Sequence, residues 1–195
     1  MRAMRPSLRL ALAALLLAAP AAPVLAQQAA TAAPGSLTGD LLMDVGQLEQ
    51  KVMGLARAIP ADKYGWRPGP GVRSVSEVLM HVAADNYLLP AAMGHPAAPA
   101  TGIRGDDFKT AQAFERRQLG RDSTIAELQR SFTHLKATLS ATPADRMAAP
   151  VSMFGQPSTV QRMWIATATH LHEHLGQLIA YARSNNVVPP WGQGG

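Results

Sequence analysis

Four segments of this 195-residue chain carry apolar residues at intervals of three and four, and this spacing constrains the fold more than any other feature of the sequence. On an α-helix such residues share one face, which can be buried against other helices. The four segments are residues 36–59, 74–89, 123–141 and 158–184. No stretch between them shows a convincing strand pattern. The sequence therefore predicts an all-α fold, a four-helix bundle.

Two capping boxes indicate where helices begin. Ser74 and Glu77 have the Ser-x-x-Glu spacing, in which each side chain accepts a hydrogen bond from a free amide of the first turn. The stretch 158–161 has the related Ser-x-x-Gln form, so we expect the longest helix to begin at residue 158. The stretch from Pro90 to Gly94 is expected to close the second helix.

The first 26 residues have the layout of a secretory signal peptide. Three arginines precede an apolar run, residues 10–19, that is too short to cross a bilayer, and residues 24–26 form a small-x-small type of cleavage site. We therefore predict export to the periplasm or the extracellular space, with no membrane span after cleavage; an uncleaved anchor is the alternative. The expected parts of the chain are a signal peptide (1–26), a disordered leader (27–35), one domain (36–186) and a flexible tail (187–195).

Charge and cysteine content exclude two classes of protein. Removing the signal peptide takes away three arginines and no acid, which lowers the formal charge from +5 to +2. A nearly neutral domain without a basic cluster gives no support for nucleic-acid binding. The chain has no cysteine, so a metal site must use histidine and carboxylate ligands, and zinc-finger folds are excluded.

The most informative polar residues are two histidines near the C-terminus. His170 and His174 are four residues apart, so on a helix both imidazoles can point at one spot, which is a metal-ligand spacing. A third ligand must come from another helix. His172 points to the opposite side, and we expect it to be solvated. The alternative is that His170 and His174 are buried histidines, hydrogen-bonded to Thr167 and Gln177.

Three motifs, taken together, resemble the DinB superfamily of DinB/YfiT-like proteins. They are Trp66-x-Pro68, Ser74-x-x-Glu77-x-x-x-His81 and His170-x-x-x-His174-x-Gly176-Gln177. The resemblance covers nearly the whole mature chain and implies a four-helix bundle of DinB/YfiT type. It also implies that His81, His170 and His174 bind a divalent metal ion, zinc or nickel; three imidazoles accept iron or cobalt as well. Family members often have a further histidine where this chain has Glu173.

The family includes transferases that use low-molecular-weight thiols, so the resemblance implies a metal-dependent thiol S-transferase or hydrolase acting on a small molecule. Glu173, which neighbours both ligands on the last helix, is the candidate general base. Asp85 and Gln177 are candidate outer partners of the ligands. We expect the long connection 95–120 to cover the mouth of the site. The alternative is a non-catalytic metal-binding or protein-interaction bundle, and the sequence is compatible with a homodimer.

Overall fold

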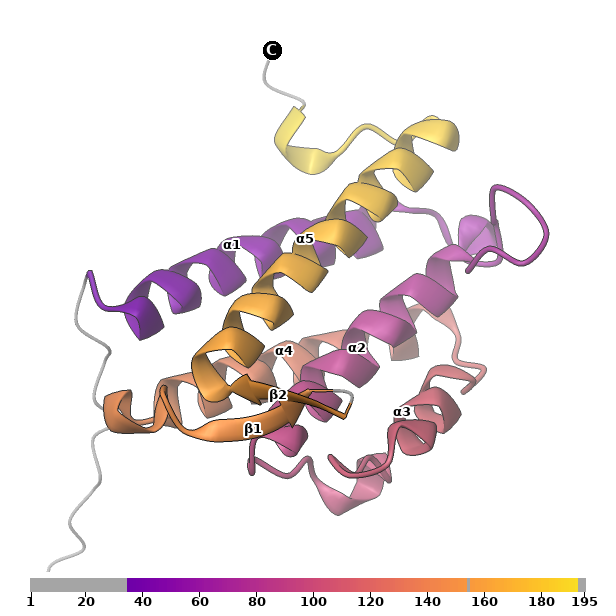
Figure 1. Cartoon of the computed structure of the whole chain (residues 1–195). Helices are drawn as coiled ribbons and strands as arrows, with labels where there is room; N and C mark the ends of the chain where they lie inside the picture. The colour runs from indigo at the N-terminus through magenta and orange to yellow at the C-terminus, as the bar shows by residue number, and fades with distance from the viewer. Residues whose placement is uncertain (1–34, 154, 193–195) are drawn as a thin grey trace, which may run out of the picture.

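This computed structural model describes residues 35–153 and 155–192, which contain five α-helices, a short β-hairpin and four short 3-10 helices (Figure 1). The helices are α1 (Leu37–Ala58), α2 (Val75–Ala92), α3 (Phe108–Glu115), α4 (Arg121–Ala141) and α5 (Val160–Ser184). The antiparallel hairpin consists of β1 (Pro150–Met153) and β2 (Gln156–Thr159). The predicted all-α bundle is confirmed: α1, α2, α4 and α5 form it, and α3 is a short helix beside α2.

Each long helix packs against two others, α1 against α4 and α5, and α2 against the same two. The apolar faces that meet in the bundle bury large side chains completely, among them Leu48, Leu79, Leu128, Phe132 and Trp164. Removing one side chain of this size from water contributes about 1.5–3 kcal/mol. The core therefore holds α2 and α5, the two helices that carry the predicted metal-binding histidines, against each other.

Helix α2 begins as predicted and ends at Ala92, within the stretch 90–94 that was expected to close it. The capping box is present: Ser74 Oγ accepts from the Glu77 amide at 3.3 Å, and Glu77 Oε2 accepts from the Ser74 amide at 2.7 Å. Pro90 lies inside the helix, in its last turn. There a proline removes only one hydrogen bond of the helix, and Pro90 itself is buried. The C-cap residue is Met93, before Gly94 with its φ of +94°.

The start of α5 differs from the prediction, because Ser158 belongs to strand β2. Ser158 pairs with Val151 in the hairpin, and Thr159 caps the helix by accepting a hydrogen bond from the Arg162 amide at 3.2 Å. The expected Ser158 capping box was therefore wrong. The hairpin escaped prediction because each strand has only four residues and begins with, or contains, a proline.

The two ends of the chain are only partly described. The predicted signal peptide (1–26) and residues 27–34 of the predicted leader lie outside the described residues. Within residues 35–153 and 155–192, no helix combines the length and the apolar character that crossing a bilayer demands. At the other end, the turn Pro190–Gly192 contacts α1, and residues 193–195 are not described. That the tail 187–195 is flexible stays a prediction.

The connection 95–120 is held against α2 at a glycine. A Cβ atom added to Gly105 would lie 2.3 Å from the carbonyl carbon of Ala91 in the last turn of α2. No flexible side chain can give way there, since the neighbouring atoms are backbone. The close approach fixes the segment that leads into α3.

We predict that Gly105→Ala destabilises the protein by about 1–3 kcal/mol, because the new methyl group forces the connection away from α2. Gly65→Ala is the matched control, since a Cβ there would meet no heavy atom within 4 Å. Chemical denaturation of the two variants and of the wild type measures the difference. Equal stability of the two variants would show that the connection does not depend on this contact.

Candidate metal centre

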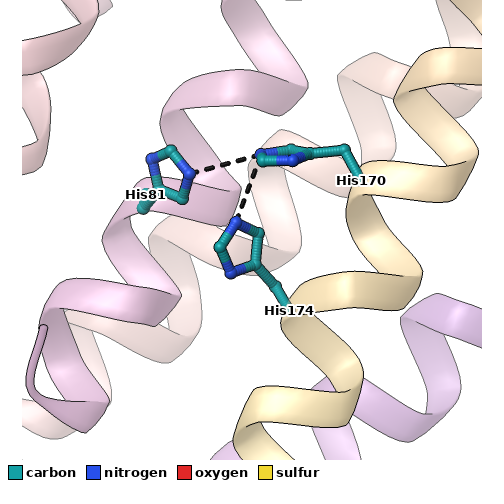
Figure 2. A group of neighbouring side chains, drawn as sticks. All are labelled: His81, His170 and His174. Atoms are coloured by element: carbon teal, nitrogen blue, oxygen red, sulfur yellow. Dashed lines mark hydrogen bonds between the residues drawn. The ribbon is translucent and has the colours of Figure 1, made fainter. Parts of the chain in front are cut away.

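The three predicted histidines converge between α2 and α5 (Figure 2). His81 extends from the second turn of α2, whereas His170 and His174 extend from consecutive turns of α5. The Nε2 atom of His170 lies 3.2 Å from Nε2 of His81 and 3.2 Å from Nε2 of His174. Two helices that are distant in the sequence therefore present three ring nitrogens to one point.

These separations fit a shared metal ion. A tetrahedral ion with nitrogen ligands at about 2.0–2.1 Å places neighbouring ligand atoms roughly 3.3 Å apart. The two measured Nε2–Nε2 distances agree with this value. Donors from two helices and of one chemical type thus form a set that can hold a divalent ion, as the sequence predicts for His81, His170 and His174.

Two of the imidazoles are oriented by an acceptor at the opposite ring nitrogen. Nδ1 of His81 lies 2.8 Å from Oε1 of Glu115, and Nδ1 of His174 lies 2.9 Å from Oε1 of Gln177. An amide oxygen or an ionised carboxylate can only accept, so each Nδ1 carries the proton. Each Nε2 is then left with a lone pair for a metal, an arrangement typical of metal-binding histidines.

The outer partners are themselves held in place. Gln177 Nε2 donates to the Tyr181 hydroxyl at 2.8 Å, and this hydroxyl donates to the Arg73 carbonyl at 3.0 Å. The Arg73 guanidinium in turn donates to Glu115 Oε2 at 3.3 Å. Hydrogen bonds therefore link α5, the loop before α2 and α3 around the three imidazoles.

Glu115 was not found from the sequence. It is the last residue of α3, 34 positions beyond the histidine that it contacts, and neither spacing nor periodicity connects the two. The connection 95–120 was expected to cover the site, and its helix α3 supplies this carboxylate. Gln177 contacts His174 as predicted, whereas Thr167 donates to the Met163 carbonyl and not to His170.

Asp85 lies closer to the centre than expected. Its Oδ2 atom is 2.7 Å from Nε2 of His170 and 3.3 Å from Nε2 of His81. The sequence predicts an outer partner at this position. The carboxylate instead sits beside the nitrogen atoms that face the candidate metal position.

The surroundings shift the pKa values of His170 and His174 in opposite directions. Burial lowers the pKa of His174 to about 4, and the charges of His170 and His81 add to this effect while the hydrogen bond with Gln177 opposes it. The hydrogen bond with Asp85 raises the pKa of His170 and outweighs the opposing effect of burial. Burial alone would raise the pKa of Glu115, but the hydrogen bond from His81 and the charges of His81 and Arg73 bring it below its usual value. His174 is thus neutral near pH 7, as a ligand must be.

Solvent reaches the cluster from the side of His170. The His170 side chain is 31% exposed, compared with 9% for His81. Glu173 is 74% exposed, and its Oε2 lies 3.5 Å from Nδ1 of His170, which is the ring nitrogen not directed at the cluster. His172 is exposed as predicted and pairs with Asp44 at 3.1 Å.

Comparison with known proteins identifies a family and a set of solved structures with a similar fold. A family model described as the DinB superfamily matches residues 46–178. A crystal structure of a DinB-like protein from Bacillus cereus superposes with a TM-score of 0.64 at 12% identity, covering 77% of this chain and 93% of that one. A DinB-like protein from Bacillus subtilis gives 0.59 at 15% identity, covering 76% and 93%. An uncharacterised protein from Escherichia coli UTI89 gives 0.58 at 17% identity, covering 77% and 95%. No curated protein matches the chain significantly.

We predict that Glu115→Ala weakens binding of a divalent metal by about 10–100-fold, because His81 loses the acceptor that fixes its ring. Glu115→Gln keeps an oxygen acceptor and should recover most of the affinity. Glu173→Ala serves as control and should change affinity much less, since its carboxylate is exposed. Isothermal titration with Zn²⁺ or Ni²⁺ measures all three. A similar loss in Glu115→Ala and Glu173→Ala would contradict the role of Glu115.

Proposed function

The chain belongs to the DinB superfamily, and on this premise we propose that it is a metal-dependent enzyme whose divalent ion is held by His81, His170 and His174. The observation that carries the proposal is the convergence of three Nε2 atoms, two of them with an acceptor fixing the opposite ring nitrogen. When bound, such an ion lowers the pKa of a coordinated water to about 7 or polarises a thiol or carbonyl group.

The residues around the three histidines would then have specific roles. Glu115 and Gln177 keep Nδ1 of His81 and His174 protonated, so that their Nε2 lone pairs face the ion. The partly exposed His170 marks the side from which a small molecule approaches. Glu173 approaches Nδ1 of His170 from the exposed surface, at 3.5 Å. Its role as a general base stays a prediction.

We propose a thiol S-transferase or a hydrolase acting on a small-molecule electrophile. Low-molecular-weight thiols are cytosolic reductants, so the proposed export to the periplasm or beyond favours the hydrolase. The support for export is the order of charged, apolar and small residues in positions 1–26. The near-neutral mature domain supports a function without nucleic acid.

Nitrogen ligands support zinc or nickel as the metal, with iron or cobalt as the other candidates. The homodimer that is compatible with the sequence stays a prediction.

A second candidate is a metal-binding bundle without turnover. The observation that favours it is the Asp85 carboxylate, 2.7 Å from Nε2 of His170, which places a fourth protein donor beside two of the three nitrogens. A four-coordinate ion with four protein ligands has no position for a substrate and serves stability alone.

We predict that the mature protein, purified without chelator, contains one divalent metal ion per chain and that His170→Ala removes it. His172→Ala is the matched control, because His172 is exposed on the same helix and points away from the cluster. Elemental analysis of the three proteins provides the measurement. Unchanged metal content in His170→Ala would reject the proposed ligands.

Measuring substrate turnover distinguishes the metal-dependent enzyme from the non-catalytic metal-binding bundle. An enzyme should convert electrophilic esters, or electrophiles with an added thiol, and lose this activity on metal removal. For either candidate, metal at 100 times its Kd should stabilise the fold by about 2.7 kcal/mol. Stabilisation without conversion of any electrophile in a broad screen would favour the non-catalytic bundle.

A further inference from the structure

We propose that Asp85 is a fourth protein ligand of the metal, so that the centre consists of three histidines and one carboxylate. This inference rests on the proposed metal binding and concerns how the ion is held. Family membership and the histidine spacing do not require it. The observation behind it is the position of Oδ2 beside two of the three Nε2 atoms.

The distances place the carboxylate oxygen among the ligand atoms. Oδ2 lies 2.7 Å from Nε2 of His170 and 3.3 Å from Nε2 of His81. Neighbouring ligands of one ion, with bonds of about 2.0–2.2 Å, are roughly 3 Å apart. The two measured separations lie on either side of this value, so Oδ2 is positioned as a neighbouring ligand of His170 and His81. Asp85 also belongs to a second group of possible ligands, His81, Asp85 and Glu115, that shares His81 with the three histidines.

The ring nitrogen that each acceptor faces distinguishes Asp85 from the outer partners. Glu115 and Gln177 contact Nδ1 atoms, which keep their protons when the opposite nitrogen binds a metal. Asp85 faces Nε2 atoms, which give up their hydrogen-bonding capacity when they bind a metal. Asp85 therefore cannot act as an outer partner of these nitrogens once an ion is present.

If Asp85 did not bind the metal ion, the burial of its carboxylate would be energetically unfavourable. The Asp85 side chain is 10% exposed, and its hydrogen-bond and ion-pair contacts within the described part of the chain are with His170 and His81. Metal binding to both nitrogens would leave the carboxylate charged and buried without a donor, which is strongly unfavourable. Coordination of the cation removes this penalty.

The four proposed ligands form two pairs, one on each of the helices α2 and α5. His81 and Asp85 are four residues apart on α2, and His170 and His174 are four residues apart on α5. Each pair lies on one face, one turn apart, and the packing of α2 on α5 turns the two faces toward each other. Each helix thus contributes two ligands.

A fourth protein ligand narrows the choice of metal. Zinc favours four ligands, so zinc would be enclosed and without an open position. Nickel, cobalt and iron accept five or six ligands and would keep one or two positions for a small molecule. If the protein is an enzyme, Asp85 favours one of these three metals.

The test compares Asp85→Asn with Asp44→Asn in the otherwise intact mature protein. Asp44 is the matched control, since it also contacts the Nε2 atom of a histidine of α5 but at the exposed surface. Affinities for Ni²⁺ and Co²⁺ come from competitive titration, and the visible absorption bands of bound Co²⁺ report its ligand set. Circular dichroism of the metal-free proteins verifies folding, and Asp85→Glu retains a carboxylate should Asp85→Asn not fold.

We expect Asp85→Asn to lower affinity by more than about 100-fold, the upper range for an outer partner. We also expect it to shift the Co²⁺ bands, with Asp44→Asn unchanged in both. Asp85→Glu should retain more affinity than Asp85→Asn. Wild-type affinity and unchanged Co²⁺ bands in Asp85→Asn would overturn the inference while leaving the three-histidine site intact. Failure of the wild type to bind any metal would overturn both.

Discussion

The packing of α2 against α5 is the interaction on which the rest of this structure depends. Helix α2 also packs against α4 and helix α5 against α1, and α1 packs against α4, so the relative position of α2 and α5 is fixed by the whole core. His81 and Asp85 lie within the buried part of α2, and His174 within the buried part of α5. A shift of either helix would separate the ring nitrogens by more than one ion can bridge. The hydrophobic core therefore determines the geometry of the candidate metal centre.

Polar groups inside such a core need partners, and this need explains the layered surroundings of the imidazoles. The innermost layer is the three Nε2 atoms with the Asp85 carboxylate, and the next is formed by Glu115 and Gln177 at Nδ1 atoms. Buried polar atoms without partners cost several kcal/mol, so each added layer stabilises the one inside it. Helix α3 belongs to this arrangement, since its last residue completes the partners of His81.

The structural relatives share the fold at identities of only 12–17%. A bundle tolerates such divergence because it needs apolar stripes of roughly the right volume more than particular residues. Metal binding is less tolerant, since metal–ligand distances must stay within about 0.2 Å of their usual values. For this reason the fold similarity supports the architecture, whereas the proposed activity rests on the side chains of this chain.

The sequence by itself determined the helical segments, the bundle class and the one-turn spacing of His170 and His174, because these follow from local periodicity along one chain segment. The pairing with His81 came from the family motifs. Only the tertiary structure decided the rest: that Glu115 reaches His81 from α3, that Asp85 faces the Nε2 atoms, and that Ser158 enters a hairpin and leaves the cap to Thr159. These features arise from contacts between residues far apart in sequence or from a competing strand pairing. Local sequence patterns do not predict such contacts. The contacts form only when helices that the core already holds in place bring their side chains together.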